Sequence, residues 1–422
     1  MTLDTTAATT PAAHACREPY GFWLDSALVD GRLGRASLWG QEPYLILRSK
    51  GNDVELWQRG GTSHLQASPF AVLRQLLRDE RRSPEGGVAG YFAYDLKQHV
   101  ERLPSRAQDD LALPDCYLCF YDRINRFDPR LAAPHPIEGD GGKAGRPEIT
   151  STFTPEAYRR AVERAKRYIS DGDIYQVNLS QRFQAPLRQQ PLDLYLRLRR
   201  LNPAPFAAYL NLPEAQVLSA SPERFLLFDP ESRRVQTRPI KGTRPRGATA
   251  DDDRRLSQEL LESEKDRAEN VMIVDVERND LGRVAEIGSV QAPHLTELER
   301  FATVFHLTST VEAHLRPDRD LVDLLLATFP SGSITGAPKI RAMEIIDELE
   351  PTARSVYTGA IGYIGFDGRL ELNIAIRTIL VKGETAYFQA GGGVVADSDP
   401  AAEYQETLDK AGALAQAVLG ER

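Results

Sequence analysis

Apolar and polar residues alternate over much of this chain, and the elements that the alternation predicts are mainly strands. The alternation is strict in residues 175–183. Further strands are expected in residues 44–47, 54–57, 87–94, 116–121, 206–212, 216–220, 224–228, 304–315, 359–365, 370–381 and 385–395. The strands come in consecutive groups, which indicates antiparallel sheets rather than regular alternation with helices. The chain is therefore expected to have an α+β fold.

Apolar residues at helical spacing predict a smaller set of helices. They are expected in residues 69–80, 155–171, 191–201, 251–279, 321–329, 338–348 and 400–419. Two of the helix starts carry clear signals. Thr154 before Pro155 suits a capped first turn, and so does Asp399 before Pro400.

Local composition divides the chain into segments. Residues 1–18 are expected to form a flexible N-terminal tail, because their first part is rich in Thr and Ala and lacks the basic start of a signal peptide. Residues 128–150 are rich in Pro, Gly and Ala and are expected to be a linker. We therefore expect a β-rich subdomain over residues 19–127 and a larger catalytic domain over residues 151–420.

The overall composition excludes several classes of function. The 422 residues carry a net charge of −8, which argues against nucleic-acid binding and against anionic membrane surfaces. No apolar run approaches the roughly 20 residues of a membrane span. Three cysteines in so long a chain favour a reducing, cytoplasmic location. Cys116 and Cys119 form a C-x-x-C without a second pair, so buried strand positions are favoured over a zinc or redox site.

Lys241 is the first candidate for chemistry. It lies between Ile240 and Gly242 at the end of a strand-like run, where solvated lysines are uncommon. Gly242 allows a tight turn or a close approach, and a lysine held there can act as a base or nucleophile. From spacing alone, an ordinary surface lysine in a turn is the alternative.

Three glutamates are candidate metal ligands. Glu269 shares the apolar stripe of its helix, where a solvated carboxylate is unexpected. Glu403 and Glu406 are one turn apart in the last helix, and Lys410 follows Glu406 by four residues. They form either an exposed salt-bridge ladder or part of a Mg²⁺ site, which needs only one or two protein carboxylates.

Other residues suggest sites for an anion. Residues 331–339 form a small-residue loop before a helix, and residues 391–393 are three glycines; each is either a binding loop or a plain tight turn. Arg377 is expected in mid-strand among apolar neighbours, where an arginine normally binds a buried anion. His306, also in a strand, is either a hydrogen-bonded core residue or a catalytic one.

Ordered motifs connect these residues to a known family. They lie at residues 172–180, 221–224, 239–243, 266–270, 332–339, 376–378 and 402–407. Together they resemble the chorismate-utilising enzymes, the family of anthranilate synthase component I, aminodeoxychorismate synthase component I, isochorismate synthase and salicylate synthase. The resemblance is strong over residues 150–420 and weaker over residues 20–127.

The resemblance implies a fold and a site. The fold would be two large antiparallel β-sheets packed as a sandwich with helices outside, with a Mg²⁺ site between them. At matching positions, Glu269 and Glu406 would bind Mg²⁺ with Glu403 nearby, and Glu223 would be the general acid. Residues implied in binding chorismate are Arg377, Thr335, Gly336, Tyr357, Gly392, Gly393 and Lys410, and His306 is implied as a catalytic residue in the pocket.

The resemblance implies that the residue at position 241 differs between family members that catalyse different reactions. Anthranilate synthases usually have a small residue there, whereas Lys241 is similar to aminodeoxychorismate synthase component I of para-aminobenzoate and folate biosynthesis. The lysine would form a covalent intermediate with chorismate. Anthranilate synthase component I and a non-catalytic chorismate-binding regulator are the alternatives.

The resemblance also implies partners. Nothing in the chain resembles a glutaminase, so ammonia is expected from a separate glutamine amidotransferase subunit or from free ammonium. Residues 24–28 and 34–37 resemble the region where relatives hold tryptophan. Feedback control, a structural ligand and an empty relic remain open roles for that region.

Overall fold

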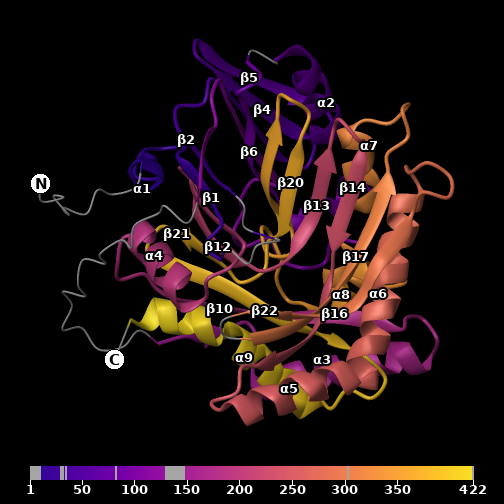
Figure 1. Cartoon of the computed structure of the whole chain (residues 1–422). Helices are drawn as coiled ribbons and strands as arrows, with labels where there is room; N and C mark the ends of the chain where they lie inside the picture. Colours follow the sequence, from indigo (N-terminus) through magenta and orange to yellow (C-terminus); the bar gives the residue numbers. More distant parts are fainter. Residues whose placement is uncertain are drawn as a thin grey trace, which may run out of the picture.

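The structure is a computed structural model that describes residues 11–28, 33, 36–80, 83–128, 148–301 and 304–420. In this part of the chain the strands form one 10-stranded and one 12-stranded sheet, and every pairing between the labelled strands is antiparallel. Helices lie outside the sheets (Figure 1). The expected α+β sandwich is therefore confirmed.

The first sheet combines strands from the early and the late parts of the chain. Its strands follow the order β18-β10-β22-β21-β12-β11-β1-β2-β8, with β9 paired to β10. Their bounds are β1 Phe22–Asp25, β2 Ser37–Gly40, β8 Asn125–Phe127, β9 Thr150–Ser151, β10 Gln176–Pro186, β11 Phe206–Asn211, β12 Gln216–Ser221, β18 Gly336–Ala337, β21 Thr378–Lys382 and β22 Thr385–Val394.

The second sheet also combines early and late strands. Its order is β15-β17-β14-β13-β20-β19-β6-β7-β3-β4-β5, with β16 paired to β17. The bounds are β3 Leu45–Lys50, β4 Asp53–Gln58, β5 Gly61–Gln66, β6 Gly87–Phe92, β7 Cys116–Tyr121, β13 Arg224–Asp229, β14 Arg234–Arg238, β15 Ile240–Pro245, β16 Gln291–Arg300, β17 Val304–His314, β19 Ala360–Gly365 and β20 Leu370–Ile374. Strands from both sides of residues 128–150 thus build both sheets.

The described helices lie outside the sheets (Figure 1), and the described residues also include the 3₁₀ turns η1 and η3. Their bounds are α1 Pro11–Ala15, α2 Pro69–Asp79, η1 Tyr94–His99, α3 Pro155–Ser170, α4 Pro191–Leu201, α5 Ala250–Glu262, α6 Glu264–Gly282, α7 Leu321–Thr328, η3 Gly332–Ile334, α8 Lys339–Leu349 and α9 Pro400–Leu419. The expected caps are present, since Thr154 accepts from Ala157 N and Asp399 accepts from Ala401 N and Ala402 N.

Apolar side chains from both sheets meet in the middle of the molecule. Phe22 and Leu210 of the first sheet pack with Ile46, Tyr91 and Ile361 of the second. A second cluster lies under α4 and α9, and the largest lies among α2, α3, α7 and α8. Burial of these faces is the main stabilising contribution to such a fold.

Several segments differ from the sequence-based expectation. The helix expected over residues 251–279 is two helices, because Ser263 ends α5 and caps α6 by accepting from Asp266 N. The strand expected over residues 370–381 is also two, since β20 and β21 belong to different sheets. Strand β16 was not expected, because none of its side chains is buried and most of them are polar.

The N-terminal tail and the linker lie only partly within the described residues. Residues 1–10 and 129–147 are outside them. Residues 11–15 of the expected tail form α1, whose Ala12 and Ala13 pack against Trp23 in the cluster under α4.

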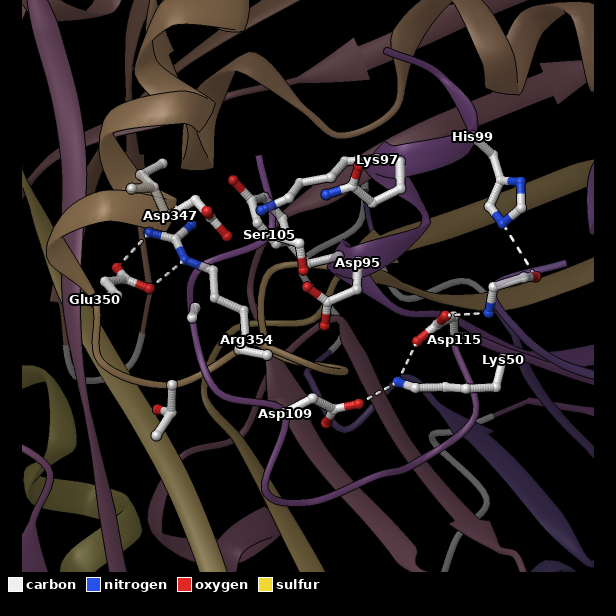
Figure 2. A pocket seen from close by; sticks show the side chains of 17 residues that line it. Lys50, Asp95, Lys97, His99, Ser105, Asp109, Asp115, Asp347, Glu350 and Arg354 are labelled. Carbon is white, nitrogen blue, oxygen red and sulfur yellow. Dashed lines mark hydrogen bonds and ion pairs between the residues drawn. The ribbon is translucent and has the colours of Figure 1, made fainter. Parts of the chain in front are cut away.

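A cavity of about 170 Å³ opens where η1, the segment after it and the end of α8 meet (Figure 2). It is lined by charged side chains from both sides of the expected linker, among them Lys97 and Asp347.

Candidate active site

Lys241 lies at the start of β15 with its side chain turned inward. It is 9% exposed, its Nζ is 3.1 Å from Glu269 Oε1, and it donates to Ser333 O at 3.0 Å. Gly242 follows with φ +78°, and a Cβ there would lie 3.0 Å from Asp266 Cβ. Only glycine therefore lets β15 turn so closely against α6, and the turn directs Lys241 into the interior.

Glu223 lies beside Lys241 between β12 and β13. It is 3% exposed, and its Oε1 accepts from Ile240 N at 3.1 Å. Burial raises the pKa of Glu223 to about 7, although the Ser333 hydrogen bond and the Lys241 charge act in the opposite direction. A carboxyl group with this pKa can hold and release a proton at neutral pH.

Two glycines of β22 allow the three glutamates to lie close to the strand. A Cβ on Gly392 would lie 3.1 Å from Glu403 Oε2 and 3.1 Å from Glu406 Oε1. A Cβ on Gly393 would lie 2.7 Å from Glu269 Oε1. The absence of side chains at these positions brings carboxylates from α6 and α9 to the same short stretch of strand.

Each of these carboxylates has a different set of partners. Glu269 Oε1 accepts from Gln176 Nε2 at 2.6 Å as well as facing Lys241. Glu406 lies 2.5 Å from Lys410 Nζ, and although burial acts to raise its pKa, the Lys410 charge lowers it overall. Glu403 accepts from Ser398 Oγ at 2.6 Å, and burial raises its pKa.

The residues fit a Mg²⁺ site of the type with few protein ligands. Glu403 Oε2 is buried and has no hydrogen-bond partner within the described ranges. The donors around Gly392 and Gly393 are carboxylate oxygens, which Mg²⁺ prefers. No three His, Cys, Asp or Glu side chains in residues 11–420 that the structure describes form a complete metal cluster. A metal here would therefore need water and substrate oxygens in addition to the glutamates.

Arg377 is not in mid-strand, and that expectation is wrong. It lies between β20 and β21, where the chain crosses from the second sheet to the first, and its φ is +53°. Its Nη1 donates to Lys410 O at 2.6 Å. Burial lowers its pKa, against the opposing influence of Tyr357 and Glu406. The crossover places a partly buried guanidinium in the electrostatic field of the α9 glutamate Glu406.

His306 on β17 faces the same region. Its Nδ1 is 2.9 Å from Thr243 Oγ1, and its ring packs edge-on against Phe301. Burial and the charges of Arg377 and Lys410 lower its pKa to about 3. The imidazole is therefore neutral at physiological pH, which suits hydrogen bonding better than proton exchange.

The remaining residues expected around the substrate lie before α8, in the turn after it and, for Lys410, on α9. Thr335 is fully buried, and its hydroxyl donates to Ser331 O and Gly332 O. Gly336 has φ +144°, and a Cβ there would lie 2.2 Å from Gln176 O. Tyr357 is 7% exposed, and burial raises its pKa to about 12. Lys410 donates to Gly391 O at 3.1 Å.

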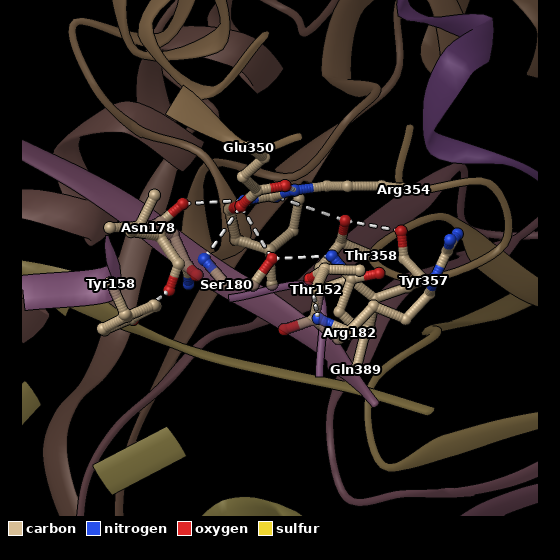
Figure 3. Close-up of polar contacts among 12 residues, drawn as sticks. Thr152, Tyr158, Asn178, Ser180, Arg182, Glu350, Arg354, Tyr357, Thr358 and Gln389 are labelled. Carbon is tan, nitrogen blue, oxygen red and sulfur yellow. Dashed lines mark hydrogen bonds and ion pairs between the residues drawn. The ribbon is translucent and has the colours of Figure 1, made fainter. Parts of the chain in front are cut away.

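Sequence reasoning missed a buried ion pair behind this site, Glu350–Arg354 (Figure 3). Arg354 donates to both carboxylate oxygens of Glu350, to Asn178 O at 2.7 Å and to Ile334 O at 2.9 Å. Glu350 Oε1 accepts from Ser180 N and Ser180 Oγ. A Glu and an Arg four residues apart after a helix look like an exposed pair, so the sequence held no signal for their burial.

Two further residues were also missed. Gln176 was noted only as part of a motif, but its amide joins β10 to Glu269. Glu277 on α6 is fully buried and accepts from Ser331 Oγ at 2.8 Å and Gly332 N at 3.0 Å. Glu277 thereby holds the small-residue loop that provides Ser333 O to Lys241.

The remaining sequence-based expectations concern the cysteines, the N-terminal motif and membrane spans. Cys116 and Cys119 are buried free thiols of β7, as expected. Leu24, Ser26 and Ala36 line a cavity of about 470 Å³ between the sheets, in the region that resembles a tryptophan pocket. None of the described helices is long and apolar enough to cross a membrane.

Comparisons with known proteins give consistent similarities. The model of the chorismate binding enzyme family matches residues 25–416. The chain is 38% identical to aminodeoxychorismate synthase component 1 of Bacillus subtilis (strain 168), covering 93% of this chain and 91% of the relative. It is 45% identical to anthranilate synthase component 1 of Thermus thermophilus, covering 95% and 93%. The crystal structure of anthranilate synthase component I from Streptococcus pneumoniae TIGR4 matches with a TM-score of 0.79 and 32% identity, covering 92% and 94%.

Proposed function

The chain belongs to the chorismate binding enzyme family, and from that premise we propose that it is an aminodeoxychorismate synthase component I. The proposed reaction converts chorismate and ammonia into 4-amino-4-deoxychorismate. The observation that carries the proposal is the position of Lys241, which points inward to Glu269 and lies within the electrostatic reach of Glu223 and Glu406. Overall identity does not separate the two synthases, since relatives of both kinds match at similar levels.

The first step uses Lys241 and Glu223. An uncharged Lys241 amine attacks C2 of chorismate, the two conjugated ring double bonds shift to C1=C6 and C4=C5, and the C4–O bond breaks. Glu223, whose pKa is about 7, gives its proton to the departing hydroxyl, which leaves as water. The substrate is then bound to Lys241 through a C–N bond, and the nitrogen carries the positive charge.

The second step returns the lysine. Ammonia attacks C4, both double bonds shift back to their positions in chorismate, and the C2–N bond breaks so that Lys241 leaves as a neutral amine. The product carries the new ammonium group at C4, and Glu223 remains ionised until it takes up a proton from solvent. Atoms and charges balance without a further reactant.

The cationic side chains and the backbone around Gly392 would bind the doubly charged substrate. The Arg377 guanidinium and Lys410 are suited to one carboxylate, and neutral His306 is suited to a hydrogen bond. Glu269 and Glu406, with Glu403 nearby, would hold Mg²⁺. When bound there, Mg²⁺ neutralises substrate charge and acts as a Lewis acid.

The same proposal includes the partners expected from the sequence. Ammonia would come from a separate glutamine amidotransferase subunit, in keeping with the name component 1 of the relatives. The cavity at Leu24, Ser26 and Ala36 would be the place for a tryptophan molecule, and its volume of about 470 Å³ is large enough for one.

Anthranilate synthase component I is the second candidate. The 45% identity to the Thermus thermophilus protein favours it. Lys241 argues against it, because the resemblance places a small residue at this position in those enzymes.

Product identification tests the proposal. The purified chain is incubated with chorismate, Mg²⁺ and ammonium, and the products are separated by chromatography and identified by mass. We expect 4-amino-4-deoxychorismate without release of pyruvate. Anthranilate with equimolar pyruvate would assign the second candidate instead, and unchanged chorismate would indicate a non-catalytic binder.

A further inference from the structure

The cavity shown in Figure 2 lies outside the candidate active site and has its own set of charges. Arg354 forms the wall between the two sites, since it lines this cavity while donating to Asn178 O and Ile334 O on the other side. None of the proposed steps uses this cavity.

Lys97 is the unusual member of the lining. It is 3% exposed, and its ammonium group lies 4.4 Å from the centre of the Tyr94 ring. In Figure 2 its side chain extends from η1 across the cavity toward the α8 side. Among the described residues the ammonium has no hydrogen bond and no ion pair within 4.0 Å; burial lowers the pKa of Lys97, although the charges of Asp95 and Asp347 act in the opposite direction. A buried ammonium normally has acceptors, because an unpaired buried charge is costly.

Tyr94 adds a second group without a partner. The residue is fully buried, and its hydroxyl makes no hydrogen bond within the part of the chain that the structure describes. Tyr94 lines the same cavity as Lys97. A hydroxyl can both donate and accept, so it can serve a ligand carboxylate beside the ammonium.

Two carboxylates face the cavity with unused oxygens. Asp95 Oδ2 accepts from Ser355 N at 2.9 Å, and Asp347 Oδ2 accepts from Arg106 N at 2.7 Å. The Oδ1 atoms of both have no hydrogen-bond partner among the described residues. Burial raises the pKa of Asp95 to about 6 although the Lys97 charge acts in the opposite direction, so a cation in direct contact with Asp95 would be stabilising.

The other charges of the lining are already paired. Lys50 Nζ is 2.5 Å from Asp109 and 2.7 Å from Asp115, and Arg354 is paired with Glu350. The uncommitted groups are therefore one ammonium, one hydroxyl and two carboxylates.

We propose that this cavity binds a small zwitterion, a molecule the size of an amino acid with one carboxylate and one ammonium group. The ligand carboxylate would accept from Lys97 and Tyr94, and its ammonium would donate to Asp95 and Asp347. A simple anion would face the two carboxylates, and a simple cation would face Lys97, so neither satisfies the whole lining. The volume of about 170 Å³ limits the ligand to small members of this class.

Equilibrium binding to the full-length chain tests the site without any reaction. Thermal shifts are screened with the protein amino acids, and each hit is titrated by calorimetry beside acetate and methylammonium, which carry only one of the two charges. We expect at least one amino acid to bind more tightly than either control, and to raise the unfolding temperature by mass action.

Variants assign the site. Lys97→Met keeps the length of the side chain and should weaken binding by about tenfold or more, equivalent to a loss of one charged contact. Tyr94→Phe should weaken it by a smaller factor, and Lys166→Met, a lysine on α3 outside the cavity, should leave it unchanged. Circular dichroism of each variant checks that it is folded.

Three results would overturn the inference. The first is that no amino acid binds the wild-type chain at concentrations up to about 10 mM. Binding that needs a higher concentration would not indicate a specific site. The second is that Lys97→Met and Tyr94→Phe both bind as the wild type does. The third is that acetate or methylammonium binds as tightly as the best zwitterion. Because chorismate is absent, none of these results depends on the proposed reaction.

Discussion

Two buried ion pairs contact the same strand, β10, and differ in how fully they are hydrogen-bonded. Glu350–Arg354 contacts Asn178 and Ser180, whereas Lys241–Glu269 contacts Gln176. The first pair lies behind the substrate-side residues, and the second lies among them.

The Glu350–Arg354 pair is buried, and each nitrogen of the guanidinium group makes a hydrogen bond. Its side chains are 2% and 1% exposed, two parallel hydrogen bonds join them, and the backbone of two segments, β10 and η3, completes the set. The Lys241–Glu269 pair has a single 3.1 Å contact, and its side chains are 9% and 14% exposed. A saturated pair fixes the positions of its neighbours, whereas an unsaturated one keeps capacity for a ligand. Incomplete pairing of buried charges therefore distinguishes the working site from its support.

Removal of the unsaturated lysine should have the largest effect on activity. Lys241→Ala removes the proposed nucleophile, so ammonia-dependent formation of aminodeoxychorismate should fall by about 10³-fold or more. Product is quantified by chromatography at saturating chorismate. Full turnover in the variant would exclude a covalent role for Lys241.

The carboxylate of the same pair should control the metal requirement. Glu269→Gln keeps the shape but removes the charge, so the Mg²⁺ concentration for half-maximal rate should rise by about tenfold or more, or activity should be lost. A Mg²⁺ titration of the initial rate measures this. Glu348→Gln, in a half-exposed carboxylate on α8, is the control. An unchanged titration in Glu269→Gln would argue against ligation.

The saturated pair should instead control stability. Arg354→Met leaves Glu350 buried without its partner, so the free energy of unfolding should fall by about 3–5 kcal/mol. Lys241→Met should cost less, because Glu269 keeps Gln176 and remains partly accessible to water. Urea unfolding of both variants measures the difference. Equal losses would remove the distinction between the two pairs.

The smallest of the expected effects concerns pH. Glu223 acts in its protonated form and Lys241 in its uncharged form, so at a fixed concentration of free ammonia, and where Lys241 is already uncharged, the rate should decrease as the pH rises above about 7. The decline should approach tenfold per pH unit. Glu223→Gln cannot release a proton and should lower the rate and abolish this limb. A limb that persists in Glu223→Gln would belong to another group.

Much of the fold could be predicted from the sequence, because strict alternation and capping residues are local signals. Strand β10 and the start of α3 follow directly from such patterns. Strand β16 could not be predicted, since its partner β17 stabilises it although none of its side chains is buried. The crossover at Arg377 depends on which sheet each flanking strand joins, and no local pattern encodes that choice.

The candidate site shows the same limit. The sequence motifs identified Lys241, Glu269 and Glu406 as candidate site residues. In the structure Lys241 contacts Glu269, and its charge acts on Glu406. Glu350, Arg354 and Lys97 carry no motif in their neighbourhood that separates a buried charge from an exposed one. Their burial results from contacts between segments far apart in the chain, which the spacing of residues does not reveal.

The most direct test of a shared site for metal and substrate is calorimetry of chorismate binding to the Lys241→Ala variant, with and without Mg²⁺. Without the nucleophile the substrate remains intact, so equilibrium affinities can be measured. If Glu269 and Glu406 hold the metal beside the substrate, Mg²⁺ should tighten chorismate binding by about tenfold or more, and chorismate should tighten Mg²⁺ binding equally. The same chorismate affinity with and without Mg²⁺ would contradict a common site at these glutamates.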